Sequence, residues 1–181
     1  MKIFGIVGWK NSGKTTLVAA LVREFGARGL AVSTVKHAHH AFDLDRPGKD
    51  SYLHREAGAQ EVLIASHGRW ALLHELRGAA EPALAGLLQH MSPVDLVLVE
   101  GFKGEAHPKL EVRRKDSSGP PLADTDPHIV AIATDGAITP QGKPVFALND
   151  IAAIADFIQQ YYNLRGRANK LNIRKTIEGL T

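Results

Sequence analysis

The sequence predicts an α/β domain built on a mostly parallel β-sheet, and three observations carry this prediction. Short apolar runs typical of strands alternate along the chain with segments of helical periodicity. The first predicted strand, loop, helix and second strand fill about 30 residues, the size of a parallel βαβ crossover. The 181 residues favour one domain, and 44% hydrophobic and 23% charged residues are close to a globular average.

The N-terminal half begins with this βαβ unit. Residues 2–7 form an apolar run typical of a buried strand, and residues 14–25 place Leu17, Leu21 and Phe25 on one helix face. The second strand is expected over residues 30–35. Farther along we expect a short helix over 52–59, strands over 61–66 and 69–76 about a Ser-His-Gly turn, and a helix over 81–90.

The C-terminal half continues the alternation. Residues 93–99 are almost continuously apolar, which is typical of the middle of a parallel sheet, whereas residues 109–114 alternate like an edge strand. Further strands are expected over 128–134 and 144–148, followed by a helix over 150–162 capped by Asn149 or Asp150. The whole chain predicts seven or eight strands, a few of them antiparallel edge strands.

Composition excludes several classes of protein. The sequence contains no cysteine, which excludes disulfides, thiolate nucleophiles, Fe–S clusters and cysteine-bound zinc. It has no apolar run of about 18 residues and no signal-peptide layout, so we expect a cytoplasmic protein without a membrane span. Residues 163–181 carry five basic residues and one acid, and the remaining 162 carry 17 and 18. We therefore expect one domain at 1–162, which the loop described next marks as nucleotide-binding, with a basic tail at 163–181 and no nucleic-acid partner.

One loop carries a specific chemical signature. Residues 8–15 read Gly-Trp-Lys-Asn-Ser-Gly-Lys-Thr and fit the phosphate-binding pattern G-x-x-x-x-G-K-[ST] between a strand and a helix. Such a loop turns backbone N–H groups around phosphate oxygens, its lysine reaches the β- and γ-phosphates, and its threonine ligates Mg²⁺. The sequence thus predicts the fold of a P-loop NTPase. The predicted nucleotide-binding residues of the loop are Gly8, Lys10, Asn11, Ser12, Gly13, Lys14, Thr15 and Thr16.

A second acid is expected beside Thr15. Asp95 and Glu100 stand at opposite ends of one predicted strand, about 16 Å apart. Ligands of parallel sheets lie at the carboxyl ends of strands, which favours Glu100 for Mg²⁺ or its water shell and places Gly101 near the γ-phosphate. The alternative is that Glu100 only ends the strand.

The loop after the second strand is rich in polar residues. It contains Lys36, His37, His39, Asp45, Lys49 and Asp50. We interpret it as a switch loop or as a contact to a second, anionic substrate. A metal site at His37, His39 and His40 and a plain surface loop are the alternatives, since the histidine spacing fits no familiar zinc pattern.

Selection of the base is left open between two positions. Asp135 follows the strand over 128–134 and can accept hydrogen bonds from guanine, while Asn149 and Asp150 follow the last strand. Each has a structural alternative, a turn at Asp135 or a helix cap at Asn149 or Asp150.

At this point the chain resembles the molybdopterin-guanine dinucleotide biosynthesis adaptor family, MobB. The resemblance covers about residues 2–162. The phosphate loop contributes to it, but two other stretches are more particular. These are Thr34-Val35-Lys36-His37 with Pro47-Gly48-Lys49-Asp50-Ser51, and Asp95 through Val99-Glu100-Gly101-Phe102-Lys103; Ala57-Gly58-Ala59, residues 131–135 and residues 151–158 also fit.

The resemblance implies a homodimer that binds GTP with Mg²⁺ and hydrolyses it slowly. It also implies that the protein assists the nucleotidyltransferase that joins GMP to molybdopterin, with molybdopterin as a ligand and cofactor-carrying proteins as partners. At Gly13, Lys14, Thr15 and Glu100 these roles rest on matched motifs. The sequence offers no certain general base, water-positioning glutamine or arginine finger, so at most slow GTPase activity is expected beside the adaptor role.

Three other functions remain alternatives. A small-molecule kinase would need an arginine from a lid, for which Arg46 and Arg55 are the nearby candidates. A GTP-dependent metallochaperone would use the three histidines at 37, 39 and 40. A scaffold with a vestigial loop would bind no nucleotide.

Overall fold

The structure is a computed structural model that describes residues 1–38, 45–117, 119–138 and 142–166. The chain divides into two compact units. Residues 1–37 and 92–181 form the first, called here the main unit, and residues 38–91 form the second, called the inserted unit. Most of the predicted basic tail, residues 167–181, lies outside the described residues.

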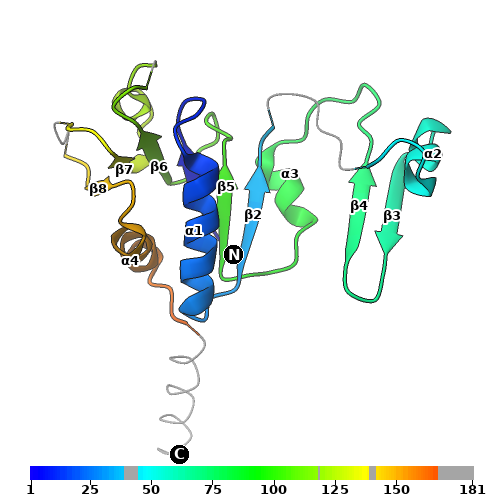
Figure 1. Cartoon of the computed structure of the whole chain (residues 1–181), viewed down its shortest axis with the longest axis horizontal. Coiled ribbons are helices and arrows are strands. Elements are labelled where there is room, and N and C mark those ends of the chain that lie inside the picture. Colours follow the sequence, from blue (N-terminus) through cyan, green and yellow to red (C-terminus); the bar gives the residue numbers. More distant parts are fainter. Residues whose placement is uncertain (39–44, 118, 139–141, 167–181) are drawn as a thin grey trace, which may run out of the picture. The chain divides into compact units, whose positions relative to one another are not determined.

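The main unit contains a six-stranded sheet in which every pairing is parallel. The strand order is β2-β5-β1-β6-β7-β8 (Figure 1). The strands are β1 (Lys2–Val7), β2 (Val32–Lys36), β5 (Leu96–Glu100), β6 (Lys109–Arg113), β7 (Ile129–Thr134) and β8 (Val145–Ala147). The predicted α/β fold with a mostly parallel sheet is therefore confirmed.

Two helices cover one face of this sheet, α1 (Lys14–Ala27) and α4 (Ile151–Tyr162). Their buried residues form one core with the side chains of β1, β5, β6 and β7 that face them. Leu21 and Phe25 of α1 and Ile158 of α4 are fully buried. Burial of a side chain of this size stabilises the fold by roughly 1.5–3 kcal/mol, so this core fixes the helix that follows the phosphate loop.

The opposite face of the sheet is covered at β7 by a shorter element. The 3₁₀ helix η1 (Leu122–Asp124) contributes Ala123 to a second cluster with Val7, Ile129 and Ile132. Here the structure corrects the expectation that residues 109–114 form an edge strand, because β6 lies between β1 and β7. The alternating polar residues of β6 are buried with partners: Lys109 pairs with Asp126 at 2.7 Å, and Glu111 accepts the N–H groups of residues 122 and 123.

The inserted unit contains α2 (Asp50–Glu56), β3 (Glu61–Ala65), β4 (Trp70–His74) and α3 (Leu84–Gln89). The two strands pair antiparallel, with Leu63 opposite Leu72. They form a small antiparallel sheet of their own, which confirms the two strands expected about the Ser-His-Gly turn. Helix α3 begins three residues after the predicted start, because Ala83 is extended and Pro82 disfavours a helical Glu81.

In the described part of the chain, none of the helices combines the length and the apolar character that crossing a bilayer requires.

The register of the parallel strands places the ends of β1, β2 and β5 side by side. Glu100 of β5 lies opposite Ile6 of β1 on one side and opposite Lys36 of β2 on the other. The carboxyl ends of the three strands therefore meet at one edge, where the loop after β1 begins. Asp95 lies at the other end of β5, where its Oδ2 accepts the Ala31 N–H at 2.9 Å. This arrangement confirms that Glu100, and not Asp95, stands at the edge where ligands of parallel sheets bind.

Candidate functional site

The loop between β1 and α1 approaches β6 too closely for a side chain at its first position. A Cβ on Gly8 would lie 2.4 Å from the Val112 carbonyl oxygen and 2.7 Å from the Ser12 hydroxyl. Ser12 is buried, while Lys10, Asn11, Thr15 and Thr16 are exposed. The loop thus holds its shape through its backbone and leaves these side chains open to solvent.

Lys14 reaches back across this loop. Its ammonium donates to the Trp9 carbonyl at 2.7 Å and lies 3.5 Å from the Ser12 hydroxyl. Burial lowers the pKa of Lys14 below its usual value, Glu100 opposes that shift, and the ammonium groups of Lys103 and Lys36 add to it. Several positive charges are therefore gathered at the loop with one carboxylate between them.

That carboxylate contacts the first turn of α1. Thr15 Oγ1 donates to Glu100 Oε1 at 2.7 Å, and Lys36 Nζ lies 3.3 Å from both oxygens. The Glu100 side chain is only 10% exposed. The structure therefore brings together three of the predicted site residues: the threonine of the loop, the acid at the end of β5 and the lysine at the end of β2.

The backbone beyond Glu100 turns sharply. Gly101 has φ +92°, and a Cβ there would lie 2.9 Å from the Cβ of His37, so glycine is required at this position. The Gly101 N–H donates to the Ile6 carbonyl at 3.2 Å. Phe102 also has a positive φ, +51°, and its ring packs on His37 with 4.7 Å between centroids.

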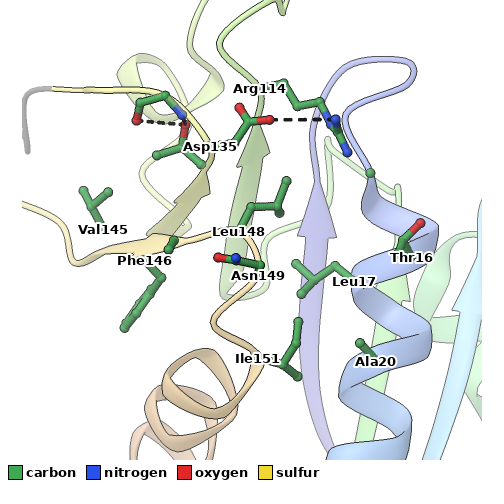
Figure 2. A pocket seen from close by; sticks show the side chains of 14 residues that line it. Thr16, Leu17, Ala20, Arg114, Asp135, Val145, Phe146, Leu148, Asn149 and Ile151 are labelled. Carbon is green, nitrogen blue, oxygen red and sulfur yellow. Dashed lines mark hydrogen bonds and ion pairs between the residues drawn. The ribbon is translucent and has the colours of Figure 1, made fainter.

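A cavity of about 860 Å³ opens beside the phosphate loop, between α1 and the ends of β7 and β8 (Figure 2). Its walls are largely apolar, and the side chains drawn in Figure 2 include Leu17, Phe146, Leu148 and Ile151. Polar groups stand at its rim: Thr16, Arg114, Asp135 and Asn149. A largely apolar hollow with a few polar groups is the usual form of a small-molecule site.

The three candidates for base selection differ in their surroundings. Asp135 Oδ1 accepts the Lys115 N–H at 2.8 Å, and its Oδ2 lies 3.8 Å from Arg114. Asp150 does not line the cavity; it caps α4 by accepting the Ala153 N–H at 3.1 Å. The helix-cap alternative is therefore confirmed for Asp150, while Asp135 and Asn149 both face the cavity.

The predicted loop at 36–50 is divided between the two units. Lys36 and His37 belong to the main unit, and His39 and His40 lie outside the described residues. Asp45, Lys49 and Asp50 line a second cavity, of about 600 Å³, within the inserted unit. Arg46 lines it too, whereas Arg55 is held by ion pairs with Asp45 and Glu75. Among the described residues, no group of three or more acids and histidines is arranged to hold a metal ion.

Two cations near the phosphate loop were not assigned a role from the sequence. Lys103 Nζ lies over the Trp9 ring, 4.2 Å from its centroid. Arg114 donates to the Ser12 carbonyl at 3.4 Å and lies beside Gly13. The sequence could have indicated both residues, because Lys103 follows the strand that ends at Glu100 and Arg114 follows β6. Both therefore lie at the carboxyl edge of the sheet.

Comparison with known proteins identifies the family. Residues 3–135 match the family model of MobB, described as molybdopterin guanine dinucleotide synthesis protein B. A molybdopterin-guanine dinucleotide biosynthesis adapter protein of Escherichia coli is 38% identical over 88% of this chain and 92% of its own. The adapter protein of Haemophilus influenzae is 37% identical over 88% of each chain.

Solved structures agree with these relatives. The crystal structure of a MobB protein homologue from Bacillus stearothermophilus matches with a TM-score of 0.68 and 27% identity, over 91% of this chain and all of the other. Bacillus subtilis MobB matches with a TM-score of 0.69 and 25% identity, over 88% and 97% of the two chains. On sequence and on structure, this chain belongs to the MobB family of molybdopterin guanine dinucleotide synthesis proteins.

Proposed function

We propose that this protein is a GTP-binding adapter in molybdopterin guanine dinucleotide biosynthesis, with Mg²⁺ beside the phosphate loop. The observation that carries the proposal is the contact of Thr15 with Glu100, 2.7 Å long, at the edge where the loop follows β1. A loop of this pattern, a lysine across it and an acid at the end of the neighbouring strand are the parts that phosphoryl-binding proteins use.

The residues present suit a magnesium ion. Mg²⁺ prefers oxygen ligands and keeps several waters, so a protein needs to supply only one or two groups beside the phosphates. Thr15 Oγ1 and Glu100 Oε1 are oxygen donors in contact, and the Lys36 ammonium within 3.3 Å of both is a cation already held there. When bound, the ion would neutralise charge on the β- and γ-phosphates, and Lys36 would turn toward a phosphate oxygen.

The large cavity of the main unit is our candidate for the base and ribose. Its apolar walls suit an aromatic ring, and the rim acid Asp135 suits the donor edge of guanine, which presents two N–H groups. Adenine offers an acceptor at the equivalent ring nitrogen, so a carboxylate there favours GTP over ATP. Asn149 lines the same cavity and can contact the base or ribose from the β8 side.

Hydrolysis at this site would be slow. The reaction adds water to the γ-phosphorus, breaks its bond to the β–γ bridging oxygen, and releases GDP and inorganic phosphate. Lys14 and Lys36 can neutralise charge, and the ring of His37 at the same edge packs on Phe102. None of the described residues of this site is a glutamine that could orient the water. Charge neutralisation without a positioned nucleophile supports binding far more than turnover, which suits an adapter.

The inserted unit offers a place for a second anionic ligand. The cavity at Asp45, Lys49 and Asp50 also has Arg46, Ser51 and His54 in its walls. Cationic and hydroxyl groups suit a phosphorylated ligand such as molybdopterin. We propose that this cavity holds the pterin, that the partner is the transferase joining GMP to it, and that cofactor-carrying proteins receive the product.

We also propose that the protein is a homodimer, with the β3–β4 hairpin in the interface. On one face of the hairpin Leu63 is 62% exposed, Leu72 is 39% exposed and Trp70 is 65% exposed. Leu63 lies directly opposite Leu72, and Trp70 opposite Ala65, so these side chains share that face. A two-stranded ribbon with an open apolar face is marginally stable alone, and a second copy would cover it.

The experiment that tests the proposal is equilibrium binding of GTP at several Mg²⁺ concentrations to Thr15→Val. Valine keeps the shape of threonine and removes the oxygen ligand. The wild type is expected to bind GTP more tightly with Mg²⁺, and Thr15→Val is expected to lose that increment while retaining Mg²⁺-free binding. Thr125→Val, at an exposed threonine after η1, is the matched control and should behave as the wild type. An unchanged Mg²⁺ increment in Thr15→Val would contradict the proposal.

A further inference from the structure

Trp9, in the phosphate loop, contacts two lysines, one through its backbone carbonyl and the other through its ring. Its carbonyl oxygen accepts a hydrogen bond from Lys14 at 2.7 Å, and its ring carries the ammonium of Lys103 at 4.2 Å from the centroid. The Lys103 and Lys36 charges both lower the pKa of Lys14, after its burial, and Glu100 acts in the opposite direction. Three ammonium groups are thus close to the loop around one carboxylate, an excess of positive charge that suits a polyphosphate.

The backbone that carries Lys103 is fixed from both sides. Before it, Gly101 and Phe102 adopt positive φ angles, a conformation that is unfavourable at a residue other than glycine. After it, the Lys103 carbonyl accepts a hydrogen bond of 2.9 Å from Lys109, whose ammonium is buried against Asp126. A strained backbone held in place by a buried ion pair is typical of functional sites. Because the backbone is held, a change of contact at Lys103 would have to come from its side chain.

The Trp9 ring is equally well fixed. Its indole N–H donates to the Pro120 carbonyl at 2.8 Å, and its face lies so close to Gly119 that a Cβ there would be 2.2 Å from the ring. The ring is therefore a rigid platform on which Lys103 rests. A cation over an aromatic ring at a partly exposed site is held more weakly than a cation in a hydrogen bond with a charged group.

From this arrangement we propose that Lys103 leaves the Trp9 ring when a nucleoside triphosphate binds, and that its ammonium contacts the terminal phosphate. The inference rests on the proposed binding of GTP. Lys103 comes three residues after Glu100, and its charge already acts on Lys14, so its ammonium lies close to the phosphate loop, where the terminal phosphate is expected. It supplies from the same chain the cation that an arginine finger supplies in other P-loop proteins. Trp9 is then a built-in reporter of the triphosphate state.

The test uses Trp70→Phe as the background, because the sequence has two tryptophans and Trp9 then remains alone. Binding of GDP and of a non-hydrolysable GTP analogue, both with Mg²⁺, is measured by calorimetry and by Trp9 fluorescence. The background protein is expected to bind both, with a fluorescence change that is larger for the analogue. Lys103→Met is expected to weaken binding of the analogue by about tenfold or more, to change GDP binding less than about twofold, and to lose the extra fluorescence change.

Two further variants test whether the effect of Lys103→Met comes from the loss of the charge at this position or from a general disturbance of the structure. Lys103→Arg keeps the charge and is expected to keep the preference for the analogue. Lys2→Met removes a lysine that lies over the Tyr162 ring at 5.6 Å, at the far end of β1, and should leave both affinities unchanged. Equal loss of GDP and analogue binding in Lys103→Met, or no loss of either, would overturn the proposed role of Lys103. The proposed binding of GTP would not be affected by that result. No binding of either nucleotide to the background protein would overturn the GTP proposal and this inference together.

Discussion

His107 is a buried side chain that the sequence did not single out. It is 8% exposed, and neither ring nitrogen has a hydrogen-bond partner in the part of the chain that the structure describes. Gly5 leaves space for it, because a Cβ there would lie 2.6 Å from Nε2. Burial lowers the pKa of His107 to about 4; Lys109 and His128 contribute in the same direction, while Glu105 and Asp126 oppose it.

This shift predicts a loss of stability in acid. The unfolded chain binds a proton at His107 below about pH 6.5, whereas the folded protein does so only near pH 4, so the loss develops between these values. Between pH 7 and pH 5 it amounts to about 2 kcal/mol. Urea unfolding of the wild type and of His107→Leu at both pH values isolates this contribution from that of the other titrating groups. The variant should lose about 2 kcal/mol less than the wild type, and equal losses would show that His107 does not titrate this way.

Asp135 is the residue at which nucleotide selectivity can be tested. We expect Asp135→Asn to reduce the preference for GTP over ATP by about tenfold or more, because an amide replaces one acceptor by a donor where guanine presents two donors. Competition binding of the two nucleotides measures the ratio. Asp124→Asn, at an exposed acid of η1, is the matched control. If the ratio of GTP to ATP affinity is unchanged in Asp135→Asn, Asp135 does not select the base, and Asn149 or the backbone of β8 becomes the candidate.

At the scale of elements, β6 is the strand whose position in the sheet could not be predicted from its sequence. The apolar runs predicted β1, β5 and β7 closely, because parallel strands buried on both faces carry little polar sequence. The alternation in β6 is equally typical of an edge strand, and its true position depends on partners that are distant in sequence. Lys109 meets Asp126, and Glu111 meets the N–H groups of Leu122 and Ala123. Nothing in the local pattern of β6 indicates these contacts.

Glu111 should therefore be a stabilising residue of the main unit. Glu111→Leu would leave the N–H groups of residues 122 and 123 unsatisfied in a buried region, which costs about 1–3 kcal/mol for each group. We expect the free energy of unfolding to fall by about 3 kcal/mol, measured by urea denaturation. Glu105→Leu, in the loop before β6, removes a partly exposed acid as a control. A loss below about 1 kcal/mol for Glu111→Leu would mean that the N–H groups find other partners.

The hairpin of β3 and β4 carries the prediction about assembly. Leu63→Lys places a charge in the middle of the exposed apolar face and should convert the proposed dimer into monomer. Sedimentation velocity measures the change. Leu53→Lys, on an exposed leucine of α2 that is 55% accessible, is the control and should stay dimeric. A wild type that is monomeric at all concentrations would contradict the proposed homodimer, and a dimeric Leu63→Lys would place its interface elsewhere.

At the scale of the whole molecule, the candidate nucleotide site belongs to the main unit alone. The phosphate loop, Glu100, Lys36 and the cavity at Asp135 all lie within residues 1–37 and 92–181. The loop signature and the strand ends were sufficient to predict Lys14, Thr15 and Glu100 as neighbours, because parallel strands end at a common edge. The division into two units was not predicted, since residues 38–91 have the same alternation of helix and strand as the rest. Lys103 and Arg114 follow strands that end at this edge, so their approximate place could have been predicted. Their contacts with Trp9 and Ser12, and the burial of His107, depend on loop conformations that local sequence patterns do not specify.

The measurement that tests this interpretation most directly is equilibrium binding of GTP and of ATP, with and without Mg²⁺, to the wild type and to Lys14→Ala. Lys14 lies across the phosphate loop with its pKa lowered mainly by burial, yet it keeps a hydrogen bond to the loop, so it is placed to contact a phosphate. We predict that the wild type binds GTP more tightly than ATP and that this binding depends on Mg²⁺. We predict that Lys14→Ala abolishes the binding. A preference for ATP would favour the small-molecule kinase, and the absence of binding by the wild type would contradict every role that depends on a nucleotide.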